Sequence, residues 1–292
     1  MTKQGIATII SSYSNNFIVY HQNNKYSATA KSKRSGYVVG DKVIVEIDHN
    51  QQARIISLLP RQSLIFRQSI TKNKLIASNV SQLCIVISHQ PKCNLYFLDC
   101  CLVFCESQQI SPLILVNKSD LPCYQQFFED IKNIYHHQLG YNLLAVSAFD
   151  DLSLLIKNIN NHNNLLIGQS GVGKSSLTAR ILNKPVKTGN LSVTGRGCHT
   201  TTSSNLYFLN NNATIIDSPG LDHFGLSHIN PHQLSNYFIE FKPYLSACKF
   251  RNCLHDQQYN CAILKALDNK QINSSRYNSY LTLISHLKKI KV

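Results

Sequence analysis

The sequence predicts a multidomain chain: an all-β barrel at the N-terminus, a central α/β domain with a mainly parallel sheet, and a helical C-terminal segment. Short runs rich in β-branched and aromatic residues fill the first sixty or so residues, with turn residues between them. From about residue 76 apolar runs alternate with helical segments, and from about Pro231 the pattern is helical. We place the three domains at residues 1–62, 63–222 and 223–292.

The N-terminal domain is expected to contain five strands, with the sequences GIATIISS, NFIVYH, KYSATA, YVVGDKVIVEID and ARIISLL. Five strands in so short a stretch fit an OB-fold, a barrel that commonly binds RNA or single strands. An SH3-like or other small barrel without a nucleic-acid role is the alternative. The stretch KSKRSG (Lys31 to Gly36) places three positive charges in one loop, where they would meet phosphates. The following LLPRQSLIFRQS is expected to be a linker that leaves the barrel.

The central domain is expected to contain five short strands, with the sequences QLCIVIS, SPLILVN, YNLLAVSA, NNLLIG and ATIIDS. Segments of helical character lie between several of them, for example LYFLDCCLVFCESQQ and FFEDIKNIYHHQL. Apolar runs that are bounded by turns and separated by helices predict a mainly parallel sheet covered on both faces.

Charge is distributed unevenly along the chain. Residues 1–75 carry eleven Lys or Arg and three Asp or Glu, residues 242–292 carry nine and two, and the middle carries nine and ten. Two basic flanks around a nearly neutral centre indicate a polyanionic partner, with nucleic acid favoured over a membrane. No apolar run approaches the ~18 residues that span a bilayer, and no secretory leader is evident. We therefore expect a cytoplasmic protein that does not bind membranes.

The stretch GQSGVGKS (Gly168 to Ser175) matches the phosphate-loop pattern G-x-x-x-x-G-K-[ST], after a strand and before the helical run SLTARIL. Glycines let backbone N–H groups turn around the β-phosphate, Lys174 places a charge on the β- and γ-phosphates, and Ser175 offers its hydroxyl to Mg²⁺. The flanking strand and helix argue against a chance glycine-rich turn. We expect a nucleoside triphosphate to be bound by Gly168, Gln169, Ser170, Gly171, Val172, Gly173, Lys174, Ser175 and Ser176.

A second motif, N-K-x-D, follows another strand and consists of Asn117, Lys118, Ser119 and Asp120. The Asp120 carboxylate would accept hydrogen bonds from N1–H and the exocyclic amine of guanine, whereas adenine presents an acceptor at N1 and leaves the anion unpaired. Alone, this motif is compatible with an ordinary polar loop, but together with a phosphate loop it predicts GTP. The guanine carbonyl would take a backbone N–H from Ser147 or Ala148. The base motif precedes the phosphate loop, the reverse of the usual order in GTPases.

Two further segments are candidates for sensing the γ-phosphate. In IIDSPG, a D-x-x-G motif after a strand, Asp217 would hold Mg²⁺ through water and the Gly220 N–H would sense the phosphate. In GRGCHTTT (Gly195 to Thr202), Thr201 would reach Mg²⁺ when the loop closes, and a solvated loop is the alternative. With GTP, Mg²⁺ would thus be held by Ser175, Thr201 and Asp217.

The residue after the D-x-x-G glycine is Leu221, where many GTPases place a glutamine that orients the attacking water. Leucine cannot orient water, so intrinsic hydrolysis should be slow or another residue must hold the water. His199 is the catalytic candidate, because an unperturbed imidazole titrates near neutrality. A structural or RNA-contacting histidine is the alternative for this position.

A cysteine/histidine cluster lies near the C-terminus, in CKFRNCLHDQQYNC. Three thiolates and one imidazole complete a tetrahedral zinc site without a vacancy for water, so the role would be structural. Buried cysteines beside a surface histidine are the alternative, but the polar residues between the ligands argue against a dry core. Such a metal would fold a segment too small for its own core and fix Lys249 and Arg251 for contact with phosphates. The ligands would be Cys248, Cys253, His255 and Cys261.

The order N-K-x-D, S-A, GQSGVGKSS, G-R-G-x-H-T-T-T, D-S-P-G and C-x4-C-x-H-x5-C resembles the ribosome small-subunit-dependent GTPase A family over nearly the whole chain. The resemblance implies a circularly permuted P-loop GTPase with an N-terminal OB-fold and a C-terminal zinc domain. It also implies a late assembly factor that binds the small ribosomal subunit and its rRNA, is stimulated by the subunit and leaves after hydrolysis. The family's histidine implicated in hydrolysis falls on His199. Cys198, at a usually basic position, and SLTAR, which lacks the usual Ile-Asn, depart from the pattern.

The main functional hypothesis is a monomeric GTPase whose cycle times its release from an assembling small subunit. An RNA-binding placeholder, in which GTP is a slow latch and hydrolysis is incidental, is a hypothesis of another class. A tRNA- or mRNA-directed GTPase with the same basic flanks is a third.

Overall fold

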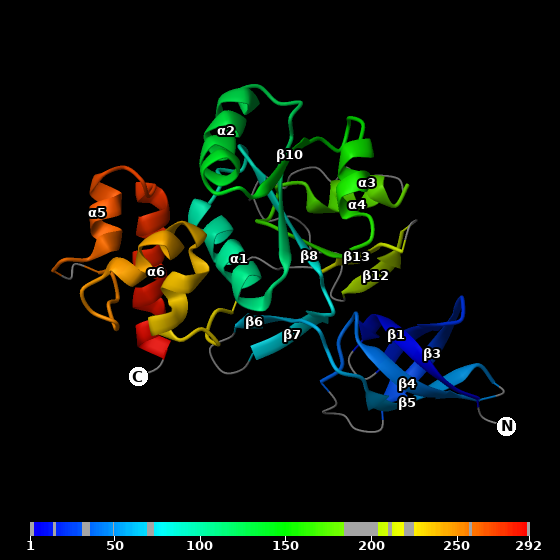
Figure 1. The fold of residues 1–292 in the computed structure, drawn as a ribbon. Helices are drawn as coiled ribbons and strands as arrows, with labels where there is room; N and C mark the ends of the chain where they lie inside the picture. The colour runs from blue at the N-terminus through cyan, green and yellow to red at the C-terminus, as the bar shows by residue number, and fades with distance from the viewer. Residues whose placement is uncertain are drawn as a thin grey trace.

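The computed structural model describes residues 3–13, 16–30, 36–48, 50–68, 73–183, 204–209, 212–218, 225–256 and 259–290. They form a small barrel, a sheet covered by helices, and a C-terminal group of helices (Figure 1). His199, Thr201, Gly220 and Leu221 lie outside these residues, as do residues 31–35 of the predicted basic loop. Among the helices of the described part, none is long and apolar enough to span a bilayer.

The N-terminal barrel confirms the five predicted strands: β1 (Lys3–Tyr13), β2 (Asn16–His21), β3 (Asn24–Ala30), β4 (Lys42–Ile47) and β5 (Gln52–Leu58). The strand order is β1-β2-β3-β5-β4, and pairing of β1 with β4 closes the barrel, as in an OB-fold. Because side chains alternate across a strand, every second residue points inward. Phe17, Val19, Val43, Val45 and Ile55 are among the buried residues of this small core.

The prediction of a linker after the barrel is wrong in part, because residues of that stretch form β6 (Leu64–Gln68), which pairs in a hairpin with β7 (Asn73–Ser78). The hairpin is fixed to the barrel by Asp41, whose carboxylate is fully buried. It accepts hydrogen bonds from Arg61 at 2.7 and 2.8 Å and from the Ser78 hydroxyl at 2.6 Å. A buried charge needs such complete pairing, so this network joins the barrel to the hairpin.

The central sheet is mainly parallel, as predicted. Its parallel strands are β8 (Gln82–Ser88), β9 (Ser111–Asn117), β10 (Asn142–Val146), β11 (Asn163–Ile167) and β13 (Thr214–Asp217). One strand was not foreseen: β12 (Asn205–Phe208), only four residues long, pairs antiparallel with β13 at the edge. The spatial order is β10-β9-β8-β11-β13-β12, and β12 in turn pairs with β1 of the barrel.

Both faces of the sheet are covered, which explains why its strands are apolar without alternation. Leu83, Ile85 and Ile87 of β8 face a core that includes α1 (Leu95–Gln108), α2 (Tyr124–Ile131) and the π-helical η1 (Lys132–Gln138). Cys84 and Val86 face a second core with α3 (Ser153–Ile159) and α4 (Lys174–Ile181). The two helical layers flank the sheet in Figure 1.

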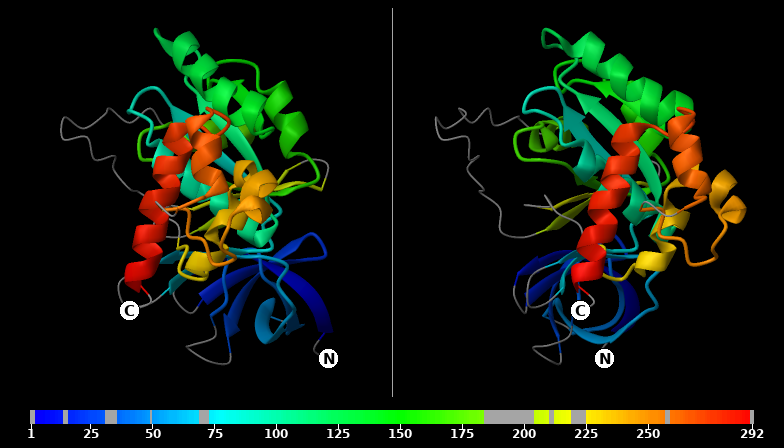
Figure 2. Two further views of the ribbon diagram at one scale, coloured as in Figure 1. Left: turned by 60° about the vertical axis from the view of Figure 1, so that its left-hand side comes forward. Right: turned by 90° about the vertical axis from the view of Figure 1, so that its left-hand side faces the viewer.

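The C-terminal region consists of two 3₁₀ segments, η2 (Pro231–Tyr237) and η3 (Ile239–Ala247), followed by the helices α5 (Ala262–Asp268) and α6 (Ser274–Ile290). They pack beside α1, as the views in Figure 2 show. Residues 97–105 of α1 are therefore buried on every side, between the sheet and these helices. The C-terminal helices share the large core of α1 and do not form a separate one.

Candidate functional site

Three of the predicted nucleotide motifs follow parallel strands of the same sheet. The phosphate loop follows β11, N-K-S-D follows β9, and Asp217 ends β13. The carboxyl ends of parallel strands meet at one edge, which is where open α/β sheets bind ligands. The sheet order therefore brings together segments whose order in the chain is unusual.

The phosphate loop is a tight turn between β11 and α4, and all three of its glycines have backbone conformations that favour glycine. Gly168 has φ = +153°, and a Cβ there would lie 2.2 Å from the Val86 carbonyl oxygen. The Lys174 Nζ donates hydrogen bonds to the carbonyl oxygens of Gly168 at 2.6 Å and Gln169 at 2.7 Å. The loop thus folds around its own lysine, with the helix N-terminus directly behind it, an arrangement suited to phosphates.

Asn117 joins the base motif to the phosphate loop. Its side chain is only 2 % exposed, and its Nδ2 donates a hydrogen bond to the Val172 carbonyl oxygen at 2.7 Å. The approach is so close that a Cβ on Gly173 would lie 2.3 Å from the same nitrogen. The two motifs are therefore locked together, although 55 residues of chain separate Asn117 from Val172.

Lys118 and Asp120 stand at the end of β9, next to this bond. Lys118 has φ = +67°, and its Nζ donates to the Gln90 carbonyl oxygen at 2.6 Å. Burial lowers the pKa of Lys118, while the nearby Asp120 carboxylate acts in the opposite direction. The Asp120 side chain itself is exposed, as a carboxylate that receives a ligand from solvent must be.

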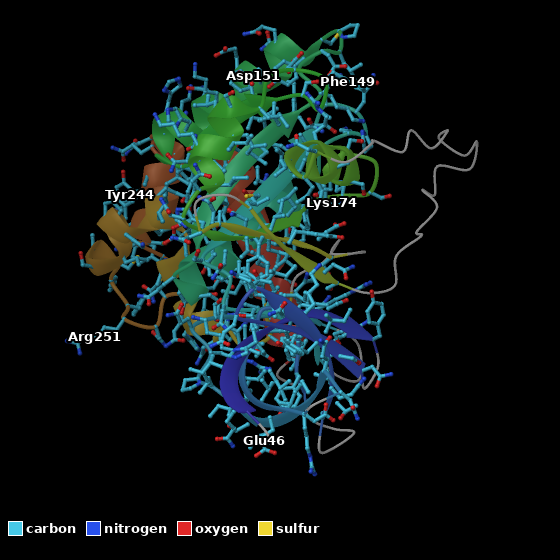
Figure 3. All side chains as sticks on the ribbon, turned by 90° about the vertical axis from the view of Figure 1, so that its right-hand side faces the viewer. Glu46, Phe149, Asp151, Lys174, Tyr244 and Arg251 are labelled. Carbon is cyan, nitrogen blue, oxygen red and sulfur yellow. The ribbon has the colours of Figure 1, made fainter. Side chains whose placement is uncertain are left out.

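The loop after β10 is fixed between the base motif and α4. The Ser119 N–H donates to the Val146 carbonyl oxygen at 3.2 Å, and the Ser147 hydroxyl oxygen accepts from the Phe149 N–H at 3.1 Å. Arg180 of α4 donates to the Ala148 carbonyl oxygen at 3.0 Å. Phe149 and Lys174 lie on the same side of the molecule in Figure 3, far from Arg251. These hydrogen bonds hold the loop beside the base motif.

Asp217 ends β13 and is followed by the buried Ser218, whose hydroxyl lies 2.8 Å from that of Ser204. Its position at the carboxyl edge agrees with the predicted Mg²⁺ role, and Ser175 lies in the first turn of α4. Thr201 and Gly220, with the catalytic candidate His199, lie outside the described residues. Their roles stay predictions.

Sequence reasoning missed a further segment at this edge, the loop of residues 89–94 between β8 and α1. Gln90 holds Lys118, as described above, and the Asn94 N–H donates to the Gln169 Oε1 at 2.9 Å. Asn94 also caps α1, because its side chain accepts from the Phe97 N–H at 3.2 Å. An Asn before an apolar run signals a helix start, but no sequence signal reveals its contact with the phosphate loop.

The four predicted metal ligands come together between η3 and α5. Their ligand atoms all lie within 4.8 Å of one another. The Nδ1 of His255 is 3.6 Å from the Cys248 sulfur and 3.4 Å from the Cys261 sulfur, and these two sulfurs are 4.0 Å apart. A tetrahedron with metal–sulfur bonds of about 2.3 Å has edges of about 3.8 Å. The cluster therefore fits a tetrahedrally coordinated metal ion.

The electrostatics of the cluster also suit a cation. Burial raises the pKa of the Cys253 thiol to about 12 and raises that of Cys261, while it lowers the pKa of His255. Thiolates in this site are thus costly unless a cation compensates them, and a neutral imidazole is a ready ligand. Tyr277 supports the loop, because its hydroxyl donates to the His255 carbonyl oxygen at 2.7 Å.

A basic and aromatic surface surrounds the cluster. The Lys249 Nζ lies 5.5 Å from the ring centre of Phe250 and 5.6 Å from that of Tyr259. Tyr259 is 76 % exposed, and Arg251 points outward at the edge of the molecule in Figure 3. Exposed rings beside cations are typical of surfaces that contact single-stranded nucleic acid.

A comparison with protein families matches residues 58–227 to the RsgA GTPase model. The small ribosomal subunit biogenesis GTPase RsgA of Nitrosomonas europaea is 40% identical over 268 residues, which cover 90% of this chain and 85% of that protein. Its namesake from Nitrosospira multiformis is 36% identical over 282 residues, 96% of this chain and 90% of that protein.

Two solved structures share the fold. YjeQ from Thermotoga maritima superposes with a TM-score of 0.77 at 24% identity, covering 98% of this chain and 99% of that one. YloQ, described as a circularly permuted GTPase, gives a TM-score of 0.73 at 22% identity, covering 99% and 97%. The fold similarity therefore extends over the barrel, the sheet and the C-terminal helices.

Proposed function

Because this chain belongs to the RsgA GTPase family and is a GTP hydrolase, we propose that it acts on the small ribosomal subunit late in the biogenesis of that subunit. Hydrolysis of GTP to GDP and phosphate is stimulated by the subunit and coupled to release from it. The names of the curated relatives support this partner. The observation that supports the nucleotide site most directly is the Asn117–Val172 hydrogen bond, which fixes a guanine-reading motif against a phosphate loop.

In this proposal the nucleotide lies along the carboxyl edge of the sheet. Asp120 reads guanine, the loop after β10 contacts the base carbonyl, and the phosphate loop holds the phosphates through backbone N–H groups and Lys174. Ser175, Thr201 and Asp217 hold Mg²⁺, which neutralises charge on the phosphates when it is bound. His199 positions the attacking water, since Leu221 cannot. The oxygen donors of the Mg²⁺ set are the kind that this hard cation prefers.

The C-terminal cluster holds one structural zinc ion through Cys248, Cys253, His255 and Cys261. Three sulfurs and one nitrogen at tetrahedral spacing support zinc over magnesium or calcium, which take oxygen ligands. The metal holds the surface of Lys249, Phe250 and Arg251 in place. The ribosomal RNA is contacted by this surface and by the barrel, in agreement with the two basic flanks of the chain.

The protein acts as a monomer in the cytoplasm, with functional units at residues 1–62, 63–222 and 223–292. The hairpin forms the transition from the first unit to the second: its strands β6 and β7 pair with each other, and Ser78 of β7 is bonded to Asp41.

Cosedimentation with ribosomal subunits tests the proposed partner. In the presence of a non-hydrolysable GTP analogue, the protein should pellet with purified small subunits. Less protein should pellet with them in the presence of GDP, and none should pellet with large subunits. Equal binding to tRNA or mRNA would favour the competing RNA-directed function.

The catalytic assignment is tested separately by the variant His199→Ala. Its subunit-stimulated turnover should fall by at least about tenfold, which corresponds to about 1.4 kcal/mol of transition-state stabilisation. Its affinity for the GTP analogue should match that of the unaltered protein. Unchanged stimulated turnover would remove His199 from the mechanism and leave the nucleotide site intact.

A further inference from the structure

The barrel is joined to the GTPase sheet through its first strand. β1 pairs antiparallel with β12, with Ser11 opposite Asn205. Ser11 is 4 % exposed, and its hydroxyl donates a 2.7 Å hydrogen bond to the Asn205 side-chain oxygen. The contact between barrel and sheet thus includes one short, nearly buried hydrogen bond at a defined residue pair.

A second contact holds the other end of β12. The ring of Tyr20, from β2 of the barrel, lies 4.3 Å from the ring of Phe208 with an angle of 36° between their planes. Aromatic pairs at this distance attract each other beyond their buried area. The short edge strand is therefore held by the barrel at both of its ends, at Asn205 and at Phe208.

The same strand sets the position of Asp217. The ladder between β12 and β13 continues to the pair Asn205–Asp217. On the other side of β13, in the described part of the chain, the ladder with β11 ends one residue earlier, at the pair Leu165–Ile216. The strand pairing that reaches Asp217 thus comes from the edge strand, whose Asn205 is bonded to the barrel.

We propose that Ser11 and Asn205 are positioning residues for the Mg²⁺ ligand Asp217, so that the barrel and the Mg²⁺ site are coupled through β12. The coupling rests on the Mg²⁺ role proposed for Asp217. It operates without a switch segment: a partner that pulls on the barrel displaces β12 and, through the Asn205–Asp217 pair, the carboxylate. By thermodynamic linkage, the factor by which the partner changes the affinity for Mg²⁺ equals the factor by which Mg²⁺ changes the affinity for the partner.

The test measures the affinity for a fluorescent, non-hydrolysable GTP analogue over a series of Mg²⁺ concentrations and also in excess chelator. The variants are Ser11→Ala, Asn205→Ala and their combination, with Ser12→Ala as the matched control, because Ser12 pairs with Phe17 of β2 instead of β12. Each single variant should raise the half-saturating Mg²⁺ concentration about two- to fivefold, the range expected for one hydrogen bond. The double variant should show the same rise, because both changes remove the same bond.

A merely structural role gives a different result. In that case the variants would lose affinity for the GTP analogue by the same factor with Mg²⁺ and in chelator, or Ser12→Ala would shift the Mg²⁺ dependence as much as Ser11→Ala. Either finding overturns the proposal. An unchanged Mg²⁺ dependence in both single variants also overturns it. Thermal unfolding of each variant, measured alongside, establishes that the compared proteins are folded.

The variant Asp217→Asn separates this inference from the proposal on which it rests. If its Mg²⁺ dependence equals that of the unaltered protein, Asp217 is not a ligand and both ideas fall. If Asp217→Asn shifts the dependence strongly while Ser11→Ala does not, only the coupling through β12 is wrong. No ribosomal particle is present in these measurements, so their outcome is independent of whether the small subunit is the partner.

Discussion

Gly173 and Asn117 form the tightest contact at the nucleotide edge. Gly173 has φ = +97° and caps α4, and the amide nitrogen of Asn117 lies only 2.3 Å from the position that a Cβ would take. Both features demand glycine, the first through the backbone and the second through the side chain of a neighbouring motif. The close contact between the two motifs thus depends on the absence of a Cβ at Gly173.

We predict that Gly173→Ala abolishes nucleotide binding while the barrel stays folded. The added Cβ would lie 2.3 Å from Asn117 Nδ2 and must displace either the phosphate loop or the Asn117–Val172 bond. Gly140→Ala is the matched control, because Gly140 also has a positive φ of +74° but nothing within 4 Å of the added atom. Calorimetric GDP titration should show binding by the control alone. Similar affinities for both variants would refute the steric argument.

For Asp120→Asn we expect GTP affinity to fall by roughly ten- to a hundredfold. Two hydrogen bonds to a carboxylate contribute about 1.5–3 kcal/mol each, part of which the neutral amide retains. The exposed Asp130→Asn, on α2 and remote from the sheet edge, serves as control. Competition with xanthosine triphosphate gives a second measurement. Xanthine carries a carbonyl where guanine carries its exocyclic amine, and the side-chain amide of the variant can donate a hydrogen bond to that carbonyl. If GTP binds the variant as tightly as before, Asp120 does not read the base.

At the residue scale, the motifs could be recognised in the sequence because each carries its own chemistry. Asn117, Lys174 and the four metal ligands lie where their spacing suggests. Gln90, Asn94 and Asn205 could not be found in this way. Their contacts depend on which loops and strands meet at the sheet edge, and the sequence around a single Gln or Asn does not reveal such a contact.

Among the elements, α1 connects the sheet to the C-terminal helices. A buried charge network lies between α1 and these helices. Arg276 of α6 donates to Asp99 of α1 at 2.6 Å and to Glu240 of η3 at 2.8 Å, and the side chains of Arg276 and Asp99 are fully buried. Burial raises the pKa of Asp99, although Arg276 acts against it. The guanidinium therefore compensates carboxylates from two elements.

We predict that Arg276→Met lowers the free energy of unfolding by about 3–5 kcal/mol, because it leaves buried carboxylates without their counter-charge. Lys288→Met is the matched control on the same helix. Its ion pair with Asp256 at 2.8 Å is partly exposed, so its loss should cost at most about 1 kcal/mol. Denaturant unfolding measures both values, and equal losses would contradict the argument.

The loss in Arg276→Met should shrink as the pH falls. Without the guanidinium the Asp99 carboxyl keeps a folded-state pKa above its unfolded value. Such a group contributes stability below the unfolded pKa, and that contribution is lost as the pH rises through the folded-state pKa. The difference from the unaltered protein should accordingly be smaller at pH 5 than at pH 8. A difference that grows on acidification would show that Asp99 is not the group left unpaired.

Long apolar helices and strands could be predicted from the sequence. Short strands that depend on pairing with distant segments could not. The strands of the sheet and α1 have the length and composition that specify them. The four-residue β12 exists because it pairs with β13 on one side and β1 on the other. The five-residue β6 lies within the stretch predicted as a linker, and it is a strand because it pairs with β7.

In the whole molecule, the unusual order of the motifs leaves the nucleotide edge intact and moves the chain ends elsewhere. The barrel precedes β8 and attaches to the edge strand β12, while the C-terminal helices follow β13 and pack on α1 on one face of the sheet. Figures 1 and 2 show the barrel and the C-terminal helices as two attachments to the central sheet. A partner that contacts both the barrel and the C-terminal helices would bind on two sides of the GTPase domain.

Removal of the metal should affect the two attachments differently. We expect a strong zinc chelator to release hydrogen-exchange protection in residues 248–268, which hold the ligands and α5. The helix α6 should keep part of its protection, because it shares the core of α1, and the barrel should keep all of it. Metal analysis of the purified protein should find about one zinc per chain. Protection that is unchanged after the metal has been removed would contradict a structural role.

The rate of GTP turnover with and without purified small ribosomal subunits tests the central claim most directly. The protein alone should turn over slowly, because Leu221 cannot orient water, and large subunits should leave that rate unchanged. Small subunits should raise it by at least about tenfold, equivalent to a barrier lower by about 1.4 kcal/mol. A rate that small subunits leave unchanged, or that large subunits raise equally, would contradict the proposed function.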